Sequence, residues 1–266
     1  MTVALIVSAI IAYLIGSVNS AVIISKKLAG FDVREKGSGN AGSTNMLRSV
    51  GRNAAALTLL CDVLKGVVAV LVAVIIGKIF KLDASVLAQV AAVAVIVGHT
   101  YPIFFGFKGG KGIATSLGVL LIINWNIGLV CLVFALAIMA FTRIVSLGSI
   151  LAAILFPILV IFMPSTAYIA KGNYVFFALA IAALVIFNHR TNVERLLKGK
   201  ENKLDMNMFK AKKEQPKTVA KKTEAKKEEV KPEVKKETKK VEEKEAKSTT
   251  TKKATTTKKE EVKKQK

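Results

Sequence analysis

Long hydrophobic stretches in the first 190 residues constrain the fold more than any other feature of this sequence. Residues 3–24 form the first stretch, which as an α-helix is long enough to cross the roughly 30 Å of hydrocarbon in a membrane. Similar stretches recur along the chain, so the sequence predicts an all-α integral membrane protein with about seven transmembrane helices. The predicted spans cover residues 3–24, 54–76, 84–105, 113–123, 127–141, 147–163 and 173–188.

Three details of these spans need an interpretation. The first span has no Lys or Arg before it and no small-residue cleavage site, which favours a retained helix over a signal peptide. Residues 113–123 are short, and we interpret Asn-Trp-Asn at 124–126 as an interfacial break before the next span. Asp62 and Lys65 share one face of the second span, where an ion pair between helices is favoured over direct chemistry.

Lys and Arg residues are distributed unequally between the two sides of the predicted bundle. The loops at 25–53, 106–112 and 142–146 and the chain from 189 onward are rich in them, whereas the other loops hold Lys78, Lys81 and Lys171. The positive-inside rule therefore predicts an outer N-terminus and a cytoplasmic C-terminus. The net charge of +22 beside 52% apolar residues indicates two unlike parts. We predict a membrane domain at 1–204 and a disordered Lys/Glu/Thr/Ala-rich cytoplasmic tail at 205–266.

Three polar stretches follow hydrophobic spans on the predicted cytoplasmic side. They are GSGNAGSTNMLRSVG at 37–51, FKGGKGIATS at 107–116 and NHRTNVERLLKGKE at 188–201. Glycine-rich backbone can direct several N–H groups at phosphate oxygens, and adjacent Lys and Arg complete such a site. One such loop alone is more often a plain turn. Cations that only set the topology or contact lipid headgroups would explain the charges, but not the repeated Gly, Asn and Ser. Together the stretches predict a site for two phosphates beside an acyl tail.

The stretches GSGNAGSTNMLR at 37–48, GHTYPIFFGFKGGKGIAT at 98–115 and NHRTNVERLLKGKE at 188–201 resemble the three motifs of the bacterial acyl-phosphate:glycerol-3-phosphate acyltransferases. The resemblance extends from residue 1 to about residue 204, and three motifs in order are highly specific. The family usually has proline at Ala41 and an Ile-Pro pair at Val18 and Asn19. Neither departure removes a phosphate-binding group, and the tail has no counterpart in the family pattern.

The resemblance implies a seven-span, multi-pass enzyme of the bacterial cell membrane, with the motifs on the cytoplasmic side. It would move an acyl chain from acyl phosphate to the sn-1 hydroxyl of glycerol 3-phosphate. The products would be lysophosphatidic acid and inorganic phosphate, in the first step of phospholipid synthesis. Besides these substrates and the lipid bilayer, a soluble enzyme that makes acyl phosphate is a candidate partner. The partners of the tail stay open.

The resemblance also implies roles for individual residues. Ser38 and the glycine backbone would hold acyl phosphate, and Lys111 would bridge the two phosphates. Acyl phosphate has a good leaving group, so positioning and charge stabilisation suffice without an enzyme nucleophile. The predicted catalytic residues are Ser38, Lys111, His189 and Asn192. The predicted substrate-binding residues are Gly37, Gly39, Asn40, Gly42, Thr44, Asn45, Arg48, Lys108, Gly109, Gly110, Gly112 and Arg190, of which Arg48 would hold glycerol 3-phosphate together with His189 and Asn192.

The attacking hydroxyl needs a base, for which His189 competes with a phosphate oxygen of the substrate. We favour the phosphate, because cations near His189 lower the pKa of its imidazole. His99 is interpreted as a structural residue that caps the end of its span. Cys61 and Cys131 lie within spans, so we predict no disulfide. The spacing of the His and Cys residues predicts no metal, and we predict no cofactor.

Two other classes of function remain open at this point. Gly-rich breaks and short spans also occur in transporters, which makes an organic-phosphate anion transporter the alternative. A membrane anchor for a basic tail that binds nucleic acid or anionic lipid is the third reading, although interspersed glutamates weaken it. The five-residue spacing from His189 to Glu194 resembles the His-to-Asp spacing of acyl-CoA-dependent acyltransferases. We expect Glu194 to lie beside Arg190 or Arg195 instead.

Overall fold

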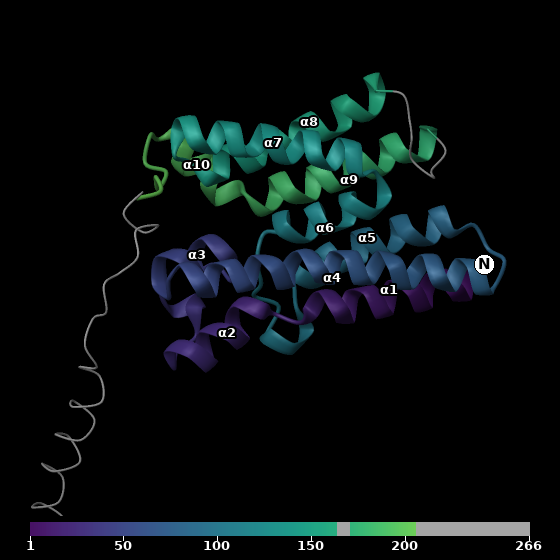
Figure 1. Cartoon of the computed structure of the whole chain (residues 1–266), viewed down its shortest axis with the longest axis horizontal. Helices are drawn as coiled ribbons and strands as arrows, with labels where there is room; N and C mark the ends of the chain where they lie inside the picture. Colours follow the sequence, from purple (N-terminus) through teal and green to yellow (C-terminus); the bar gives the residue numbers. More distant parts are fainter. Residues whose placement is uncertain (164–170, 206–266) are drawn as a thin grey trace, which may run out of the picture. The chain divides into compact units, whose positions relative to one another are not determined.

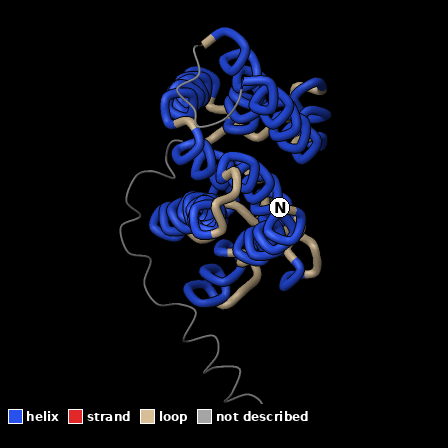
Figure 2. The backbone as a smooth tube through the Cα atoms, turned by 90° about the vertical axis from the view of Figure 1, so that its right-hand side faces the viewer, coloured by secondary structure: helices blue, strands red, loops and turns tan. Residues whose placement is uncertain are grey.

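The structure is a computed structural model of the 266-residue chain, and it describes residues 1–163 and 171–205. The described residues form helices joined by short loops, without a strand among them (Figure 2). This confirms the all-α prediction. Most of the predicted loop at 164–172 and nearly all of the predicted tail at 205–266 lie outside the described residues.

Ten α-helices and two short 3₁₀ helices follow one another along the described chain (Figure 1). Five of the described segments are long and apolar enough to cross a membrane, or six if the bent pair α9–α10 counts as one. The count of about seven spans and the N-out, C-in orientation stay predictions. The elements are α1 Thr2–Ser17, α2 Ser20–Ala29, η1 Val33–Glu35, α3 Ser43–Ser49, α4 Arg52–Ile79, α5 Ala84–Thr100, η2 Ile103–Phe105, α6 Ile113–Ile123, α7 Trp125–Thr142, α8 Val145–Phe162, α9 Lys171–Asn188 and α10 Arg190–Leu197.

The first predicted span is interrupted where the sequence departs from the family pattern. α1 ends at Ser17, and α2 begins at Ser20, so the helix predicted over 3–24 is not continuous. Asn19 caps the start of α2, because its Oδ1 accepts a hydrogen bond from the N–H of Val22 at 3.2 Å. Ser17, Asn19 and Ser20 are all buried, which keeps these polar side chains away from lipid.

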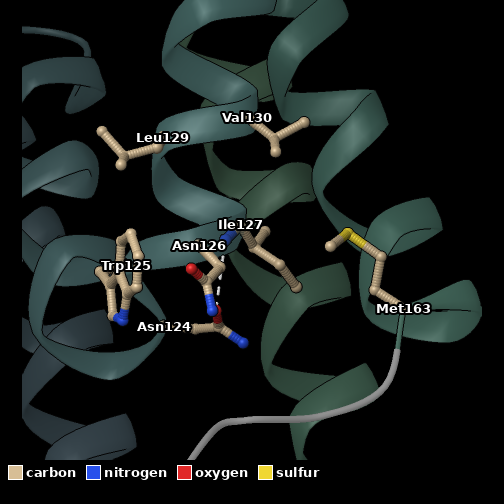
Figure 3. A pocket seen from close by; sticks show the side chains of 7 residues that line it. All are labelled: Asn124, Trp125, Asn126, Ile127, Leu129, Val130 and Met163. Carbon is tan, nitrogen blue, oxygen red and sulfur yellow. Dashed lines mark hydrogen bonds between the residues drawn. The ribbon is translucent and has the colours of Figure 1, made fainter.

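The predicted break at residues 124–126 is confirmed. α6 ends at Ile123 and α7 begins at Trp125. The Oδ1 of Asn124 accepts a hydrogen bond from the N–H of Ile127 at 3.2 Å, which caps α7 (Figure 3). A pocket of about 420 Å³ lies at this turn, lined also by Trp125 and Met163, and it contains none of the predicted site residues.

Glycines let α4 and α6 approach closely. A Cβ on Gly66 of α4 would collide with the carbonyl oxygen of Thr115, and a Cβ on Gly118 of α6 would collide with that of Val63. α4 also carries the predicted ion pair, because Lys65 Nζ lies 2.9 Å from Asp62 Oδ1. In membranes the hydrophobic effect contributes little to the association of helices, so helix packing usually relies on close approach of the backbones.

Four helices, α6 to α9, run between the second and third polar stretches. An even number of helices returns the chain to the same end of a bundle. α3 and α10 lie at one end in Figure 1, and the N-terminus lies at the other. This is the relative placement that the distribution of positive charge predicts.

Candidate active site

The first polar stretch folds around the buried side chain of Asn45, which is 1% exposed. Its Oδ1 accepts a hydrogen bond from the backbone N–H of Ser38 at 2.9 Å. Gly37 has φ +59°, and a Cβ there would collide with Asn45 Oδ1, so the position requires glycine. Asn45 therefore shapes this loop from within instead of projecting from it. Its Nδ2 donates to three loop carbonyls, those of Val33, Lys36 and Asn40, at 2.9–3.0 Å.

The rest of the first stretch leads into α3. Gly39 has φ +71°, and Gly42 caps the N-terminus of α3. Thr44 lies in the first turn of this helix, and Arg48 lies in its last turn. Ser38 is exposed at the loop, with its N–H held by Asn45. The loop thus presents the Ser38 hydroxyl while the helix carries Arg48.

Arg34 ties the first stretch to the second. Its Nη1 donates to the carbonyl oxygens of Phe105 at 2.7 Å and Lys108 at 3.0 Å. Its Nε and Nη2 donate to the Asp32 carboxylate at 3.0 and 2.8 Å. The hydrogen bonds from Arg34 lower the pKa of Asp32 to about 2, so the pair stays charged at neutral pH. Lys108 thus contributes its carbonyl group to this link, and its side chain is exposed.

The second stretch folds back onto the end of α5. The N–H of Gly109 donates to the carbonyl of Thr100 at 3.0 Å, and the N–H of Gly110 donates to that of His99 at 3.1 Å. Gly112, with φ +87°, then caps the N-terminus of α6. These contacts fix the backbone on both sides of Lys111.

Lys111 brings the second and third stretches together. Its Nζ donates a hydrogen bond to Asn192 Oδ1. Asn192 Nδ2 donates to Glu201 Oε1 at 2.8 Å, and Arg195 Nε donates to Glu201 Oε2 at 2.9 Å. Burial lowers the pKa of the Arg48 guanidinium, and the charges of Glu201 and Arg195 also act on it. We call Arg48, Lys111, Asn192, Arg195 and Glu201 the cationic cluster.

The cationic cluster carries a net positive charge. Three cations, Arg48, Lys111 and Arg195, face one carboxylate, which leaves +2. Burial, followed by the charge of Arg195, lowers the pKa of Lys111 to about 8. Burial alone would raise the pKa of Glu201, but hydrogen bonds from Arg195 and Asn192 hold it below its ordinary value. The cluster therefore favours a ligand with two negative charges.

His189 lies beside this cluster, at the bend of 63° between α9 and α10. Its side chain is 2% exposed, and Nδ1 lies 2.8 Å from the carbonyl oxygen of Val185. With Nδ1 donating there, Nε2 is left without a proton. Burial, and then the charge of Lys111, lowers the pKa of His189 to about 4, so its ring is neutral at pH 7. This direction agrees with the sequence-based expectation.

Arg190, a predicted substrate-binding residue, and Glu194 make contacts outside the cationic cluster. The guanidinium of Arg190 lies 4.7 Å from the centre of the Phe187 ring, and Arg190 Nη1 donates to the Phe187 carbonyl at 3.2 Å. Glu194 pairs with Lys198 at 2.6 Å on the exposed face of α10. The expectation that Glu194 lies beside Arg190 or Arg195 was wrong, because Lys198 is one helical turn further on and reaches the carboxylate instead.

Glu201 and Arg195 are the cluster residues that the sequence analysis did not assign to the site. The chain turns at Gly199, with φ +63°, and the N–H of Leu204 donates to the carbonyl of Arg143 at 2.7 Å. The turn returns Glu201 to the cluster, where its side chain is 6% exposed. The sequence did contain a signal for Glu201, because it is a single acidic residue that follows a glycine turn after a basic helix. In the described part of the chain, no group of three or more His, Cys, Asp or Glu residues is placed to hold a metal ion.

Comparison with known proteins assigns the chain to a family. The family model described as glycerol-3-phosphate acyltransferase matches residues 6–199. The chain belongs to the glycerol-3-phosphate acyltransferase family. A relative of that name from Clostridioides difficile (strain 630) is 44% identical over 199 residues, which cover 75% of this chain and 95% of the relative. Another from Neisseria meningitidis (strain Z2491) is 47% identical over 195 residues, which cover 73% and 94%.

Solved structures in the glycerol-3-phosphate acyltransferase family show the same arrangement of helices. The crystal structure of PlsY (YgiH), an integral membrane glycerol 3-phosphate acyltransferase, in its glycerol 3-phosphate form matches with a TM-score of 0.66 and 39% identity. The match covers 76% of this chain and 96% of that one. The lysophosphatidic acid form of PlsY matches with a TM-score of 0.65 and 37% identity. The fold of this family member is therefore that of an integral membrane acyltransferase.

The pKa of Lys111 predicts how the activity of this family member depends on pH. Below about pH 8 its ammonium group is present, and above that value it is lost. We expect kcat/KM to fall about tenfold per pH unit above pH 8, because this ratio reports the free enzyme. Steady-state rates between about pH 6 and 10 would test this. In Lys111→Arg the fall of kcat/KM at alkaline pH should move to higher pH, since a guanidinium stays charged. If kcat/KM of Lys111→Arg fell at the same pH as in the unmodified protein, the fall would be due to the titration of another group.

Proposed function

We propose that the chain transfers an acyl group from acyl phosphate to the sn-1 hydroxyl of glycerol 3-phosphate, giving lysophosphatidic acid and inorganic phosphate. This would be the first step of phospholipid synthesis, on the cytoplasmic side of a bacterial cell membrane. The observation that carries the proposal is the contact of Lys111 with Asn192, beside Arg48. This contact links the second stretch to the third, and the charge of Arg48, from the first stretch, also acts on Lys111.

The relatives support this choice of acceptor and product. PlsY is described in a glycerol 3-phosphate form and in a lysophosphatidic acid form, and the chain covers nearly all of that protein. A cluster of +2 charge suits two phosphate groups, one on each substrate. Acyl phosphate as the donor rests on the motif resemblance and on this charge.

The reaction needs no covalent enzyme intermediate. The sn-1 oxygen attacks the acyl carbon, the bond from that carbon to the phosphate oxygen breaks, and the phosphate leaves with the electron pair. Ser38 and the glycine backbone of the first stretch would hold the donor phosphate. Lys111 would stabilise charge on both phosphates, and Arg48 and Asn192 would hold glycerol 3-phosphate. Positioning and preorganised charge are sufficient for such a transfer.

The proton of the attacking hydroxyl goes to a phosphate oxygen of a substrate in this scheme. An imidazole whose pKa is about 4 is a weak base at neutral pH. A phosphate group, whose second pKa lies near 6, is the better acceptor. The unprotonated Nε2 of His189 would then accept a hydrogen bond from a hydroxyl of glycerol 3-phosphate, with the Nδ1 contact to Val185 fixing the ring.

A side-by-side donor assay tests the proposed function. The purified protein in detergent micelles is given glycerol 3-phosphate with acyl phosphate, acyl-CoA or acyl carrier protein as the donor. We expect lysophosphatidic acid only with acyl phosphate, and phosphate release only when glycerol 3-phosphate is present. Transfer from a thioester donor alone would overturn the choice of donor. The alternative, an organic-phosphate anion transporter, would form no product in micelles.

Two truncations test which residues after α10 belong to the active protein. A chain cut after Leu204 keeps Glu201 and the Leu204–Arg143 hydrogen bond, and we expect near wild-type transfer. A chain cut after Lys198 loses both, and we expect at least about a tenfold fall in kcat/KM, because Asn192 and Arg195 lose their shared partner. Initial rates on membranes with matched protein amounts measure both. Loss of transfer in the chain cut after Leu204 would make the tail at 205–266 part of the function.

A further inference from the structure

A group of buried ionisable side chains lies next to the second glycine-rich stretch and has no role in the proposed acyl transfer. Lys65 Nζ lies 2.9 Å from Asp62 Oδ1, and the two side chains are 8% and 3% exposed. Lys65 Nζ also donates to the carbonyl of Val18, at the break between α1 and α2, at 3.0 Å. His99 of α5 brings Nδ1 to 3.6 Å from the same carboxylate oxygen. The Asp62–Lys65 pair of α4 thus contacts α5 through the carboxylate and the break between α1 and α2 through the ammonium group.

The other edge of the His99 ring faces the second polar stretch. A Cβ on Gly110 would collide with His99 Nε2 and would lie 2.8 Å from the carbonyl oxygen of Ala41. The N–H of Gly110 donates to the His99 carbonyl at 3.1 Å. Gly110 is therefore held between the His99 ring and the first stretch, and the next residue is Lys111.

Stability alone is a weak explanation for this arrangement. Removing two charges from water costs several kcal/mol per ion, and well-packed apolar residues often replace a buried ion pair without loss of stability. α4 already packs closely on α6 through Gly66 and Gly118. Ionisable groups within membrane-spanning helices usually mark function. The contacts that lead from the Asp62 carboxylate through the His99 ring to Gly110 indicate what that function is.

We propose that Asp62, Lys65 and His99 are positioning residues for the second stretch. Lys65 holds Asp62, Asp62 fixes the His99 ring, and the ring fixes Gly110 so that Lys111 reaches Asn192. The three residues act through the loop and are not catalytic. The proposal rests on the proposed function, because it takes Lys111 and Asn192 as the active site.

The test replaces the whole ion pair, because Asp62→Asn alone would leave an uncompensated buried cation. In the double variant Asp62→Leu/Lys65→Met we expect kcat/KM to fall about 100-fold, the effect of misplacing a catalytic group by about 1 Å. The melting temperature in detergent should stay the same or rise. Amide hydrogen exchange over residues 107–112 should become faster, while exchange within α6 stays unchanged. Thr58→Val is the matched control, since Thr58 is also buried on α4 and its hydroxyl bonds only to the Ala54 carbonyl of its own helix.

A second variant tests the route through His99. His99→Phe keeps a ring of similar shape without the nitrogen that faces Asp62, and we expect a similar loss of kcat/KM. Added to the double variant, His99→Phe should cost little more, because residues that act in one chain of contacts are not additive. Additive losses would overturn the proposed route.

The other outcomes are equally decisive. A double variant that keeps its activity and its exchange rates overturns the proposal, and so does one that loses melting temperature and activity together, since the ion pair would then only hold the helices. If the unmodified protein transfers no acyl group from any donor, the proposed function fails. The exchange rates over residues 107–112 would still decide whether these three residues position the second stretch.

Discussion

Lys111→Ala should lower kcat/KM by about 100- to 1,000-fold, the largest loss that we expect from a single substitution. The Lys111 ammonium is the link between the glycine-rich second stretch and Asn192. It is also one of three cations that give the cluster its charge, and charge that develops on a leaving phosphate needs such a partner. Steady-state kinetics on purified protein, with both substrates varied, would measure the loss.

The matched control for this prediction is Lys198→Ala. Lys198 belongs to the third polar stretch, but its side chain is 60% exposed and pairs with the exposed Glu194. An exposed ion pair contributes little, so kcat/KM should stay within about twofold of the original. Equal amounts of both variants in the membrane fraction would show that insertion is intact. A Lys111→Ala protein with near-normal rates would remove Lys111 from the active site.

Asn192→Ala should lower kcat/KM by about 100-fold. Its side chain is 4% exposed and bridges Lys111 and Glu201, so its removal separates the second stretch from the third. Without the bridge, Lys111 is free to pair with Glu201, which Arg195 already contacts, and this lowers the positive charge available to a substrate. We expect a higher KM for glycerol 3-phosphate as well as a lower kcat.

Asn53→Ala provides the control for this second prediction. Asn53 is exposed in the first turn of α4, so the same change of side chain should leave kcat and KM unchanged. Asn192→Asp is the informative companion, because it keeps the shape of the side chain but places a second carboxylate beside Glu201. We expect it to be as inactive as the alanine variant. If Asn192→Asp were fully active, the bridge would not depend on the amide.

The hydrophobic pattern predicted the helices and the break at Asn124 correctly, because membrane burial leaves α-helices as nearly the only option for such stretches. It could not predict the interruption at Val18 and Asn19. At that break the Val18 carbonyl accepts a long-range hydrogen bond from Lys65. Contacts across 47 residues leave no periodic signal in the sequence.

The candidate site was likewise predicted only in part. Lys111 and Asn192 were predicted by resemblance, and the structure brings them into contact. Asn45 was predicted to bind substrate, whereas its amide is engaged inside the loop, a distinction that composition cannot make. Glu201 was overlooked because its role depends on a turn that folds it back over α10.

The unequal lengths of α6 and α7 set the second stretch back from one end of the helix pair. These helices pack against each other from a common turn at Asn124, but α6 has 11 residues and α7 has 18. At 1.5 Å per residue, the second stretch therefore stops about 10 Å short of the far end of α7. In the proposed reaction, the acyl chain of the donor would react while most of its methylenes remain in the hydrocarbon of the membrane. Each methylene drawn into water would cost about 0.8 kcal/mol, a penalty that a recessed phosphate cradle largely avoids.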